Sequence, residues 1–523
     1  MMTSLVATSV AMTLPVAAAS GADPRAVVLR AASSMAAAPY TFLNWEGGWT
    51  YGPALVFDGL YAAAGLVGAP EDAGWIAVMD GLLSAYARAP GGNVSACDVR
   101  LPYGGAVDRY RGCAHAVQNG SRTMAWDAFP LTTVGDSLGV FPLAYLARHK
   151  HAAIVGDAVD AAPEAGASSH DANAAATPSS LSIASMHEAD ADLELALSVA
   201  SNYLMPYPDT LPDGTFARRG GCCNGGVGGG SAPPPGGAAP QPEARYLWAD
   251  DQFMGLAVLS RLATEASLPR PARLSYARRV ARLQLQFTQY LRDPTDGLNA
   301  HGAYVPPAAG GASGAAAHVR HSCCKWGRAN GWGMLSHVEV LDALEGFPRE
   351  LGAEREAVRA DFVRGVDAML AAQDGSSGMW RQVVNDSSTF LETSVTAMMV
   401  AALATGLERR WLPSSVGSDS GAPGAHSSPG TRSVSGAGSS YAVALQHAWA
   451  GLAARVLPNG TVTGVCMGTG MMSNASEYNA RGTDYMQSPP GGVGAVLRAA
   501  VAMATYLDGA EGREGVPHAS VAA

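Results

Sequence analysis

Tyr246-Leu-Trp-Ala-Asp-Asp-Gln-Phe-Met-Gly-Leu-Ala-Val-Leu-Ser-Arg-Leu262 is the stretch of sequence that decides the fold. Its apolar residues recur at three- and four-residue spacing, which predicts a helix with one buried face; they are Leu247, Met254, Ala257, Val258 and Leu262. A unit of helix, polar or Gly-rich loop and helix recurs about six times along the chain. Because no segment shows sustained alternation of apolar and polar residues, the sequence predicts an all-α protein.

The predicted helices follow one another in pairs. Helix pairs that close into a ring bury their apolar faces between two layers, and the connecting loops gather at the two ends. Functional residues are then expected at helix starts and in loops at one rim of the ring. The helices are expected over residues 54–64, 74–88, 186–204, 248–263, 271–291, 325–344, 355–373, 390–406, 441–456 and 491–507.

We expect a single helical domain over residues 23–510. Three stretches rich in Ala, Ser, Gly or Pro show no period and are predicted to be disordered insertions, at about 151–183, 225–242 and 414–440. Residues 511–523 are expected to form a tail, and residues 1–22 a signal peptide or a disordered tail.

The composition narrows the classes of partner. The 523 residues carry a net charge of −10, and only 15% are charged, whereas 48% are hydrophobic. An acidic balance argues against a general binder of nucleic acid or anionic membrane, and an anionic substrate would need a local basic lining. No uninterrupted apolar run reaches roughly 18 residues, so the sequence predicts no membrane span.

Several features are compatible with export. The first 20 residues are apolar and end in small residues, as in a signal peptide, although they lack the usual basic start. The seven cysteines include the adjacent pairs Cys222–Cys223 and Cys323–Cys324, and no spacing matches a zinc site. Sequons for N-glycosylation, which are also compatible with export, occur at Asn93, Asn119, Asn385, Asn459 and Asn474. We therefore expect a secreted or extracellular protein, with a cytoplasmic one as the alternative.

Asp250 lies on the same face of its predicted helix as Met254, one turn away. A carboxylate on an apolar face costs free energy unless it is paired or has a chemical task. Asp250 and Asp251 beside Trp248 therefore suggest a carbohydrate or acid–base site. The alternative is a helix cap, since Asp is common at helix starts. Asp136 also precedes an apolar helix, and the same two interpretations apply to it.

A second cluster follows in the next part of the chain. Trp326, Arg328 and Trp332 fall within seven residues. Trp faces stack on sugar rings, and the planar guanidinium of Arg binds a carboxylate in a bidentate manner. Taken alone, the segment is equally typical of two core aromatics and a surface Arg, and His301 of a structural loop histidine.

The combination of these motifs resembles a known family. Trp248-Ala-Asp250-Asp-Gln-Phe-Met254 resembles the Trp-x-Asp-x-x-x-Met helix start of the unsaturated glucuronyl and rhamnogalacturonyl hydrolases, glycoside hydrolase families 88 and 105. Similar motifs follow in the family's order, and Asp136 falls where the family places its second acid. These motifs are Gly297-Leu-Asn-Ala-His301-Gly, Trp326-Gly-Arg328-Ala-Asn-Gly-Trp332, Gly378-Met-Trp380-Arg-Gln382-Val and Leu391-Glu392-Thr393-Ser394.

The resemblance implies an (α/α)6 barrel that removes a terminal 4,5-unsaturated uronic acid from oligosaccharides left by polysaccharide lyases, such as pectin fragments. The C4=C5 vinyl ether is hydrated, with no metal or cofactor, so the usual rule relating carboxylate separation to stereochemistry does not apply.

The resemblance also implies roles for particular residues, with Asp250 as acid/base and Asp136 as its partner. Burial near Trp248, Met254 and a second acid would raise the pKa of Asp250. Arg328 and His301 would orient the sugar, and Trp326 and Trp332 would wall it.

Three departures from the family leave questions open. Arg218-Arg219 stands where the family often has His-Lys, and would receive a carboxylate. Asp251 stands where the family more often has Thr, so either acid could face the cavity, and the spacing to Trp248 and Met254 favours Asp250. The cysteine pairs lie near the expected rim, where a disulfide between loops is one option and the connectivity stays open.

Two alternative functions remain at this stage. One is another glycosidase on the same barrel, such as an α-mannan hydrolase, and the other is a non-catalytic carbohydrate-binding protein.

Overall fold

The computed structural model describes residues 23–37, 51–67, 75–77, 79–80, 83, 141–160, 191–207, 209–219, 245–305, 319–412, 441–466, 468–483 and 490–514. Within these ranges the chain is mainly helical. Asp136 and the predicted insertions at 225–242 and 414–440 lie outside them, as do residues 161–183 and most of the predicted helix at 74–88.

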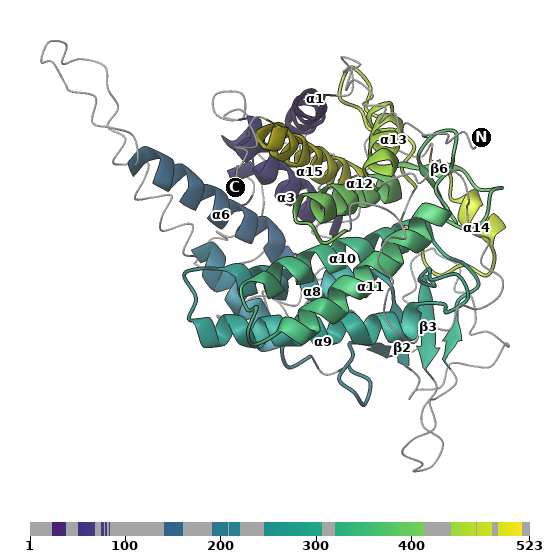
Figure 1. Ribbon diagram of the computed structural model, residues 1–523, viewed down its shortest axis with the longest axis horizontal. Helices are drawn as coiled ribbons and strands as arrows, with labels where there is room; N and C mark the ends of the chain where they lie inside the picture. Colours follow the sequence, from purple (N-terminus) through teal and green to yellow (C-terminus); the bar gives the residue numbers. More distant parts are fainter. Residues whose placement is uncertain are drawn as a thin grey trace, which may run out of the picture.

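Six of the described helices form a closed inner ring (Figure 1). Each helix of the ring packs against the next one along the chain, and the last packs against the first. In chain order they are α3 (Tyr51–Val67), α6 (Phe141–Asp160), α8 (Asp250–Thr264), α10 (Gly327–Glu345), α12 (Thr393–Glu408) and α15 (Pro490–Glu514).

Outer helices alternate with the inner ones along the chain and cover them from outside. The outer layer contains α1 (Pro24–Ala37), residues 191–199 with the π-helix η2 (Ala200–Leu204), α9 (Arg270–Leu291), α11 (Gly352–Ala371) and α13 (Tyr441–Ala453). α1 packs on α3 and α15, η2 on α8, α9 on α8 and α10, α11 on α10, and α13 on α12. The helix pairs closed into a ring that the sequence predicted are therefore present.

The inner helices are apolar on nearly every side because they have neighbours on every side. The buried run in α12 is continuous from Thr393 to Ala404, whereas α9 buries only one face. Small residues allow close crossings between inner helices. A Cβ added at Gly59 would lie 2.8 Å from Cβ of Leu497, so the contact between α3 and α15 requires glycine there.

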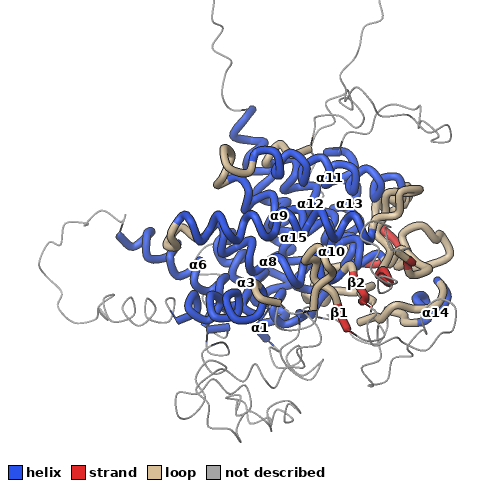
Figure 2. The backbone as a smooth tube through the Cα atoms, turned by 90° about the horizontal axis from the view of Figure 1, so that it is seen from below, coloured by secondary structure: helices blue, strands red, loops and turns tan. Residues whose placement is uncertain are grey.

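The connections from outer to inner helices carry short strands and one short helix. β1 (Arg218–Arg219), β2 (Arg245–Trp248), β3 (Gly302–Val305) and β4 (Arg320–His321) form an antiparallel sheet in that order. β5 (Trp380–Arg381) pairs with β6 (Leu391–Glu392), and α14 (Ala475–Ala480) precedes α15. Figure 2 shows the strands and α14 at one side of the helical body. This side is the rim at which the sequence predicted functional residues.

Two local predictions were wrong. Tyr246–Trp248 is a strand rather than the first turn of a helix, since it pairs with residues 302–304 of β3, and the helix begins at Asp250. Residues 151–160 are the end of α6 rather than part of an insertion, because the alanines in that stretch are strong helix formers.

Among the residues that the structure describes, one helical segment is long and apolar enough to cross a membrane by length and composition, Gly492–Ala510. It belongs to α15, which packs against α1, α3 and α12. Its place in the ring accounts for its apolar character, as it would in the core of any helical barrel.

A buried cluster of charges joins four inner helices. Arg261 of α8 donates through Nη2 to Glu339 of α10 at 3.0 Å and to Asp58 of α3 at 3.1 Å. Arg498 of α15 also donates to Glu339, and its Nη1 lies 3.5 Å from Asp58. Two cations and two anions balance one another, so the charges can be held away from water.

The cluster predicts a loss of stability in acid. Burial alone would raise the pKa of Glu339, but attraction to Arg261 and Arg498 outweighs it and lowers the pKa to about 2. The stabilisation is complete above the unfolded-state pKa of 4.5 and disappears as the pH falls towards 2. In the Glu339→Gln variant, we expect the free energy of unfolding at pH 7 to be lower, by on the order of 3 kcal/mol at most. We also expect it to change less between pH 4.5 and 2 than in the wild type.

Urea unfolding at pH 7, 4.5 and 3 measures this effect. Glu356→Gln is the matched control, because the pair of Glu356 with Arg359 lies on the surface. If the free energy of unfolding of Glu339→Gln fell with pH as steeply as that of the wild type, Glu339 would not be the source of the acid sensitivity.

Candidate active site

The side chains of the candidate site come from the starts of inner helices and the strands before them. Asp250 is the first residue of α8, directly after β2. The Ala249 amide donates to the His301 carbonyl at 2.9 Å, and the His301 amide donates to the Cys324 carbonyl at 3.2 Å. Because these backbone bonds hold the start of α8 against β3 and β4, Asp250 and His301 become neighbours.

Asp250 and His301 face each other with unsatisfied atoms. Oδ2 of Asp250 lies 3.4 Å from Nε2 of His301. Neither atom has a hydrogen-bond partner within the described part of the chain, although both are buried. The Asp250 side chain is 14% exposed and the His301 side chain is fully buried. Buried polar atoms without partners cost free energy, so their presence at a rim marks a functional site.

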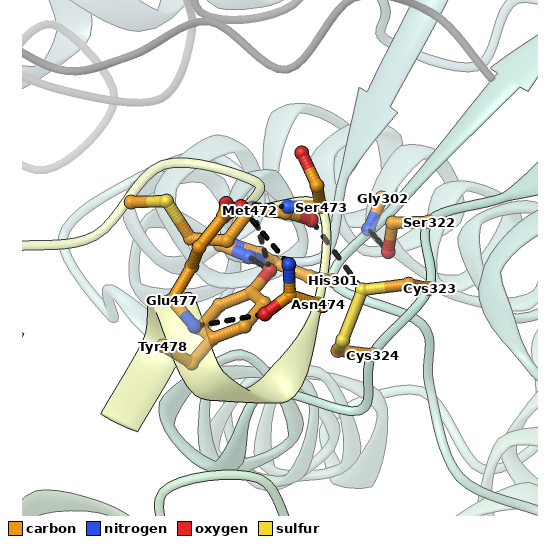
Figure 3. The surroundings of a disulfide bond; sticks show 10 residues. All are labelled: His301, Gly302, Ser322, Cys323, Cys324, Met472, Ser473, Asn474, Glu477 and Tyr478. Atoms are coloured by element: carbon orange, nitrogen blue, oxygen red, sulfur yellow. Dashed lines mark hydrogen bonds between the residues drawn. A yellow bond between two sulfur atoms is a disulfide. The ribbon is translucent and has the colours of Figure 1, made fainter. Parts of the chain in front are cut away.

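Aromatic rings surround His301. The ring centroid of His301 lies 5.3 Å from that of Trp248 and 4.5 Å from that of Trp326. Nδ1 of His301 lies 2.6 Å from the hydroxyl of Tyr478, which belongs to α14 (Figure 3). The imidazole is therefore fixed on three sides, and its Nε2 edge is directed at Asp250.

The two adjacent acids have different partners. Asp251 is 1% exposed and accepts two hydrogen bonds from Arg218, at 2.9 and 2.5 Å. The Arg218 guanidinium also lies over the Trp248 ring, 4.4 Å from its centroid. Asp251 is thus a buried ion-pair residue, and Asp250 is the acid that lies beside His301. Arg218 was predicted to receive a substrate carboxylate, and in this structure its guanidinium binds the Asp251 carboxylate.

Arg328 lies at the start of α10, where it is buried and bonded within the protein. Its Nε donates to Ser394 Oγ at 2.8 Å, and Nη2 lies 3.7 Å from Glu392 and donates to the Cys466 carbonyl. Glu392 caps α12 by accepting from the Val395 amide at 2.8 Å. Arg328 therefore braces two inner helices and the segment before α14, and its predicted contact with the sugar stays a prediction.

The free thiol in this brace is not a nucleophile at neutral pH. Burial raises the pKa of Cys466 to about 12, although Arg328 beside it acts in the opposite direction. A thiol needs to ionise before it attacks a carbon centre, so Cys466 has a packing role.

Two further predicted residues, Trp332 and Met254, lie in the core. Trp332 is fully buried and stacks on Phe253, with ring centroids 5.1 Å apart, and Met254 is also in the core. Arg219 is described only by its backbone, which pairs with Arg245. The roles predicted for these residues and for Asp136 stay predictions.

Two contributors to the site had no role in the sequence-based hypothesis. Gln382 accepts from Nε1 of Trp326 at 3.2 Å and donates to the Tyr478 carbonyl at 3.3 Å. Tyr478 lies in a stretch that reads as a glycine-rich loop. A signal for α14 exists in the sequence, because Asn474 is a helix-capping residue that accepts from the Glu477 amide, and Glu477 accepts from the Ser473 amide.

A disulfide bond joins Cys323 to its neighbour Cys324 (Figure 3). The option of a bond from this pair to another loop is therefore wrong. The Cys324 carbonyl holds the His301 amide, and Ser322 Oγ accepts from the Gly302 amide at 3.2 Å. The bonded pair is thus part of the backbone frame around His301.

The disulfide predicts a specific peptide mass. Trypsin is expected to cut after Arg320 and Lys325 and to release one peptide, 321–325, that contains both cysteines. Without reductant this peptide should resist alkylation and weigh two hydrogen atoms less than its reduced form. Mass spectrometry of the digest with and without reductant tests this, and recovery of a doubly alkylated peptide from unreduced protein would contradict it.

A ring of alternating inner and outer helices with an acid at one rim is the (α/α)6 barrel, a fold found among glycosidases. The family model described as Glycosyl Hydrolase Family 88 matches residues 147–419, more than half of the chain. The chain belongs to this family and is a glycosidase, as the motif resemblance implied. No curated protein matches the sequence.

Solved structures agree on the fold. The structure of a possible member of the GH105 family from Klebsiella pneumoniae subsp. pneumoniae MGH 78578 has a TM-score of 0.54 at 15% identity and covers 92% of each chain. A possible GH105 member from Salmonella enterica subsp. enterica serovar Paratyphi A str. ATCC 9150 has a TM-score of 0.55 at 14% identity, covering 96% of this chain and 99% of that one. A family 105 glycoside hydrolase from C. acetobutylicum ATCC 824 has a TM-score of 0.54 at 15% identity, covering 91% and 98%.

Proposed function

We propose that this glycosidase removes a terminal 4,5-unsaturated uronic acid from lyase-generated oligosaccharides of the pectin or rhamnogalacturonan type. The observation that carries the proposal is the pair of Asp250 Oδ2 and His301 Nε2, 3.4 Å apart and without other hydrogen-bond partners in the described chain. Membership of family 88 and the Trp-x-Asp-x-x-x-Met start of α8 support it.

The proposed reaction is a hydration. Asp250 begins as the neutral acid and transfers its proton to C4 of the vinyl ether. The two electrons of the C4=C5 bond form the new C4–H bond, and the positive charge at C5 is shared with the ring oxygen. A general acid in contact with the reacting atom contributes typically 10²–10⁴-fold to the rate.

Water then adds at C5, and its proton goes to the carboxylate of Asp250, which restores the acid. The product of this step is a hemiketal. Its C5–O bond to the ring oxygen breaks, which gives a ketone at C5 and a hemiacetal at C1. The hemiacetal loses the aglycone as an alcohol, so the net reaction consumes one water and leaves an open-chain keto sugar.

Trp248 and Trp326 contribute apolar surface beside the acid. Trp248 is only partly buried, whereas Trp326 is 1% exposed and contacts His301. Their rings keep the reacting pair in a low-dielectric setting, where a proton donor and a developing charge interact more strongly than in water.

An absorbance assay tests the function. We expect loss of the conjugated uronate absorbance from at least one member of a panel of unsaturated disaccharides, and no reducing sugar from saturated oligosaccharides. Reducing sugar from saturated substrates alone would favour a glycosidase that acts on intact bonds. Binding without turnover of any substrate would favour a carbohydrate-binding protein.

A further inference from the structure

The Tyr478 hydroxyl lies between a backbone amide and the imidazole of His301 (Figure 3). The Met472 amide donates to the hydroxyl oxygen at 3.2 Å, and the same oxygen lies 2.6 Å from Nδ1 of His301. Tyr478 is fully buried. Of these two contacts, the Met472 amide can only donate, whereas the role of the His301 nitrogen depends on the tautomer.

The contacts with Met472 and His301 favour one direction of the hydrogen bond between Tyr478 and His301. The Met472 amide occupies an acceptor position on the hydroxyl oxygen. A short O–H···N contact of 2.6 Å is favourable when the hydroxyl donates and Nδ1 accepts through its lone pair. A neutral imidazole that accepts at Nδ1 carries its proton at Nε2.

The other edge of the imidazole leads to the same tautomer. Nε2 faces Oδ2 of Asp250 at 3.4 Å. When the proton of the Asp250 carboxyl is on Oδ1, an unprotonated Nε2 would put a nitrogen lone pair against an oxygen lone pair, which is repulsive. With the proton on Nε2, the contact is an attractive N–H to oxygen contact. The Nε2–H form that Tyr478 favours therefore fits an Asp250 carboxyl whose proton is on Oδ1.

The surroundings hold the ring in this orientation. His301 lies against Trp248 and Trp326 and is fully buried, so the two ring edges are not readily exchanged. Tyr478 is held from its own side, because Gln382 bonds both to its carbonyl and to Nε1 of Trp326.

We propose that Tyr478 is a positioning residue that fixes His301 as the neutral Nε2–H tautomer, which reserves Oδ2 of Asp250 as an acceptor. The proton that moves to C4 and returns from water is then carried by Oδ1. This inference rests on the proposed hydration for its kinetic consequence, but the tautomer itself is a property of the protein without substrate.

The kinetic test is Tyr478→Phe, which keeps the ring and removes the hydroxyl. We expect kcat to fall by about 10- to 100-fold with little change in KM. The variant no longer fixes the tautomer of His301 beside Asp250, but it keeps every contact with the substrate. Tyr441→Phe is the matched control, since the Tyr441 hydroxyl on α13 donates to Asp367 at 2.7 Å in the outer layer. A further variant, His301→Gln, has no tautomers, so adding Tyr478→Phe to it should cause no additional loss.

The direct test is nitrogen NMR of ¹⁵N-histidine-labelled full-length protein, with His301 assigned by loss of its signals in His301→Gln. We expect an unprotonated Nδ1 and a protonated Nε2 in the wild type, and a changed tautomer population in Tyr478→Phe. A wild-type Nδ1–H tautomer or an imidazolium at neutral pH would overturn the proposal, as would wild-type kcat in Tyr478→Phe or an equal loss in the His301→Gln background. If Tyr478→Phe does not fold, the wild-type spectrum alone decides. If no unsaturated disaccharide is turned over, the proposed function fails, and the spectrum still tests the tautomer.

Discussion

Asp250→Asn is expected to lower kcat on an unsaturated disaccharide by about 10²–10⁴-fold while the protein stays folded. The amide has the shape of the carboxyl group, but it cannot give a proton to C4 or take one from water. Because the Asp250 side chain is 14% exposed and lacks a hydrogen bond at Oδ2 within the described chain, the substitution removes no structural bond that the structure shows.

Initial rates of absorbance loss measure this effect, and thermal unfolding confirms that the variant is folded. Asp508→Asn is the control, because Asp508 forms a surface ion pair with Arg25, far along the chain from α8. Turnover within a few-fold of wild type in Asp250→Asn would remove Asp250 from the acid/base role.

Asp251→Ala is expected to destabilise the folded protein by about 3–5 kcal/mol. Asp251 and Arg218 are 1% and 8% exposed and are joined by two hydrogen bonds. Removing the carboxylate leaves the guanidinium in a low-dielectric setting without this counter-ion. The double variant Arg218→Met/Asp251→Leu is expected to recover part of the loss, because it removes both charges and keeps apolar volume.

Urea unfolding at pH 7 gives both values. Asp508→Ala is the comparison, since a surface pair contributes about 0–1 kcal/mol. If Asp251→Ala were no more destabilising than Asp508→Ala, the pair would not hold the start of α8 as described.

The helical ring could be predicted from sequence because its signal is local. Apolar residues at three- and four-residue spacing define α8, α9 and α12 to within a few residues. The short strands could not be predicted, because β2 is formed by pairing with β3, whose paired residues lie 54 to 60 positions later, from Trp248 with Gly302 to Arg245 with Val305. Tyr246–Trp248 is apolar enough for either structure, and only the partner decides.

The site was predicted only in part for a similar reason. Motif spacing pointed to Asp250, His301 and Trp326, and the structure brings these three together. Spacing favoured Asp250 over Asp251 but left the choice open, because the partner of Asp251 is Arg218, 33 residues away. Nor could it identify Tyr478, which reaches His301 across 177 residues.

Arg328 and Trp332 show a different limit. Both belong to a motif that suggested sugar contacts, yet both are buried among protein neighbours at the start of α10. A motif records that residues occur together and does not separate those that hold a helix start in place from those that touch a ligand. Their substrate roles stay predictions.

Proton NMR of an unsaturated disaccharide turned over in D2O tests the hydration by Asp250 most directly. We predict that the vinyl C4–H signal disappears at the rate at which aglycone appears, and that one deuterium enters C4 on a single face, with both processes lost in Asp250→Asn. Release of aglycone together with a free sugar that still carries its vinyl proton would show displacement at C1 and would contradict the account.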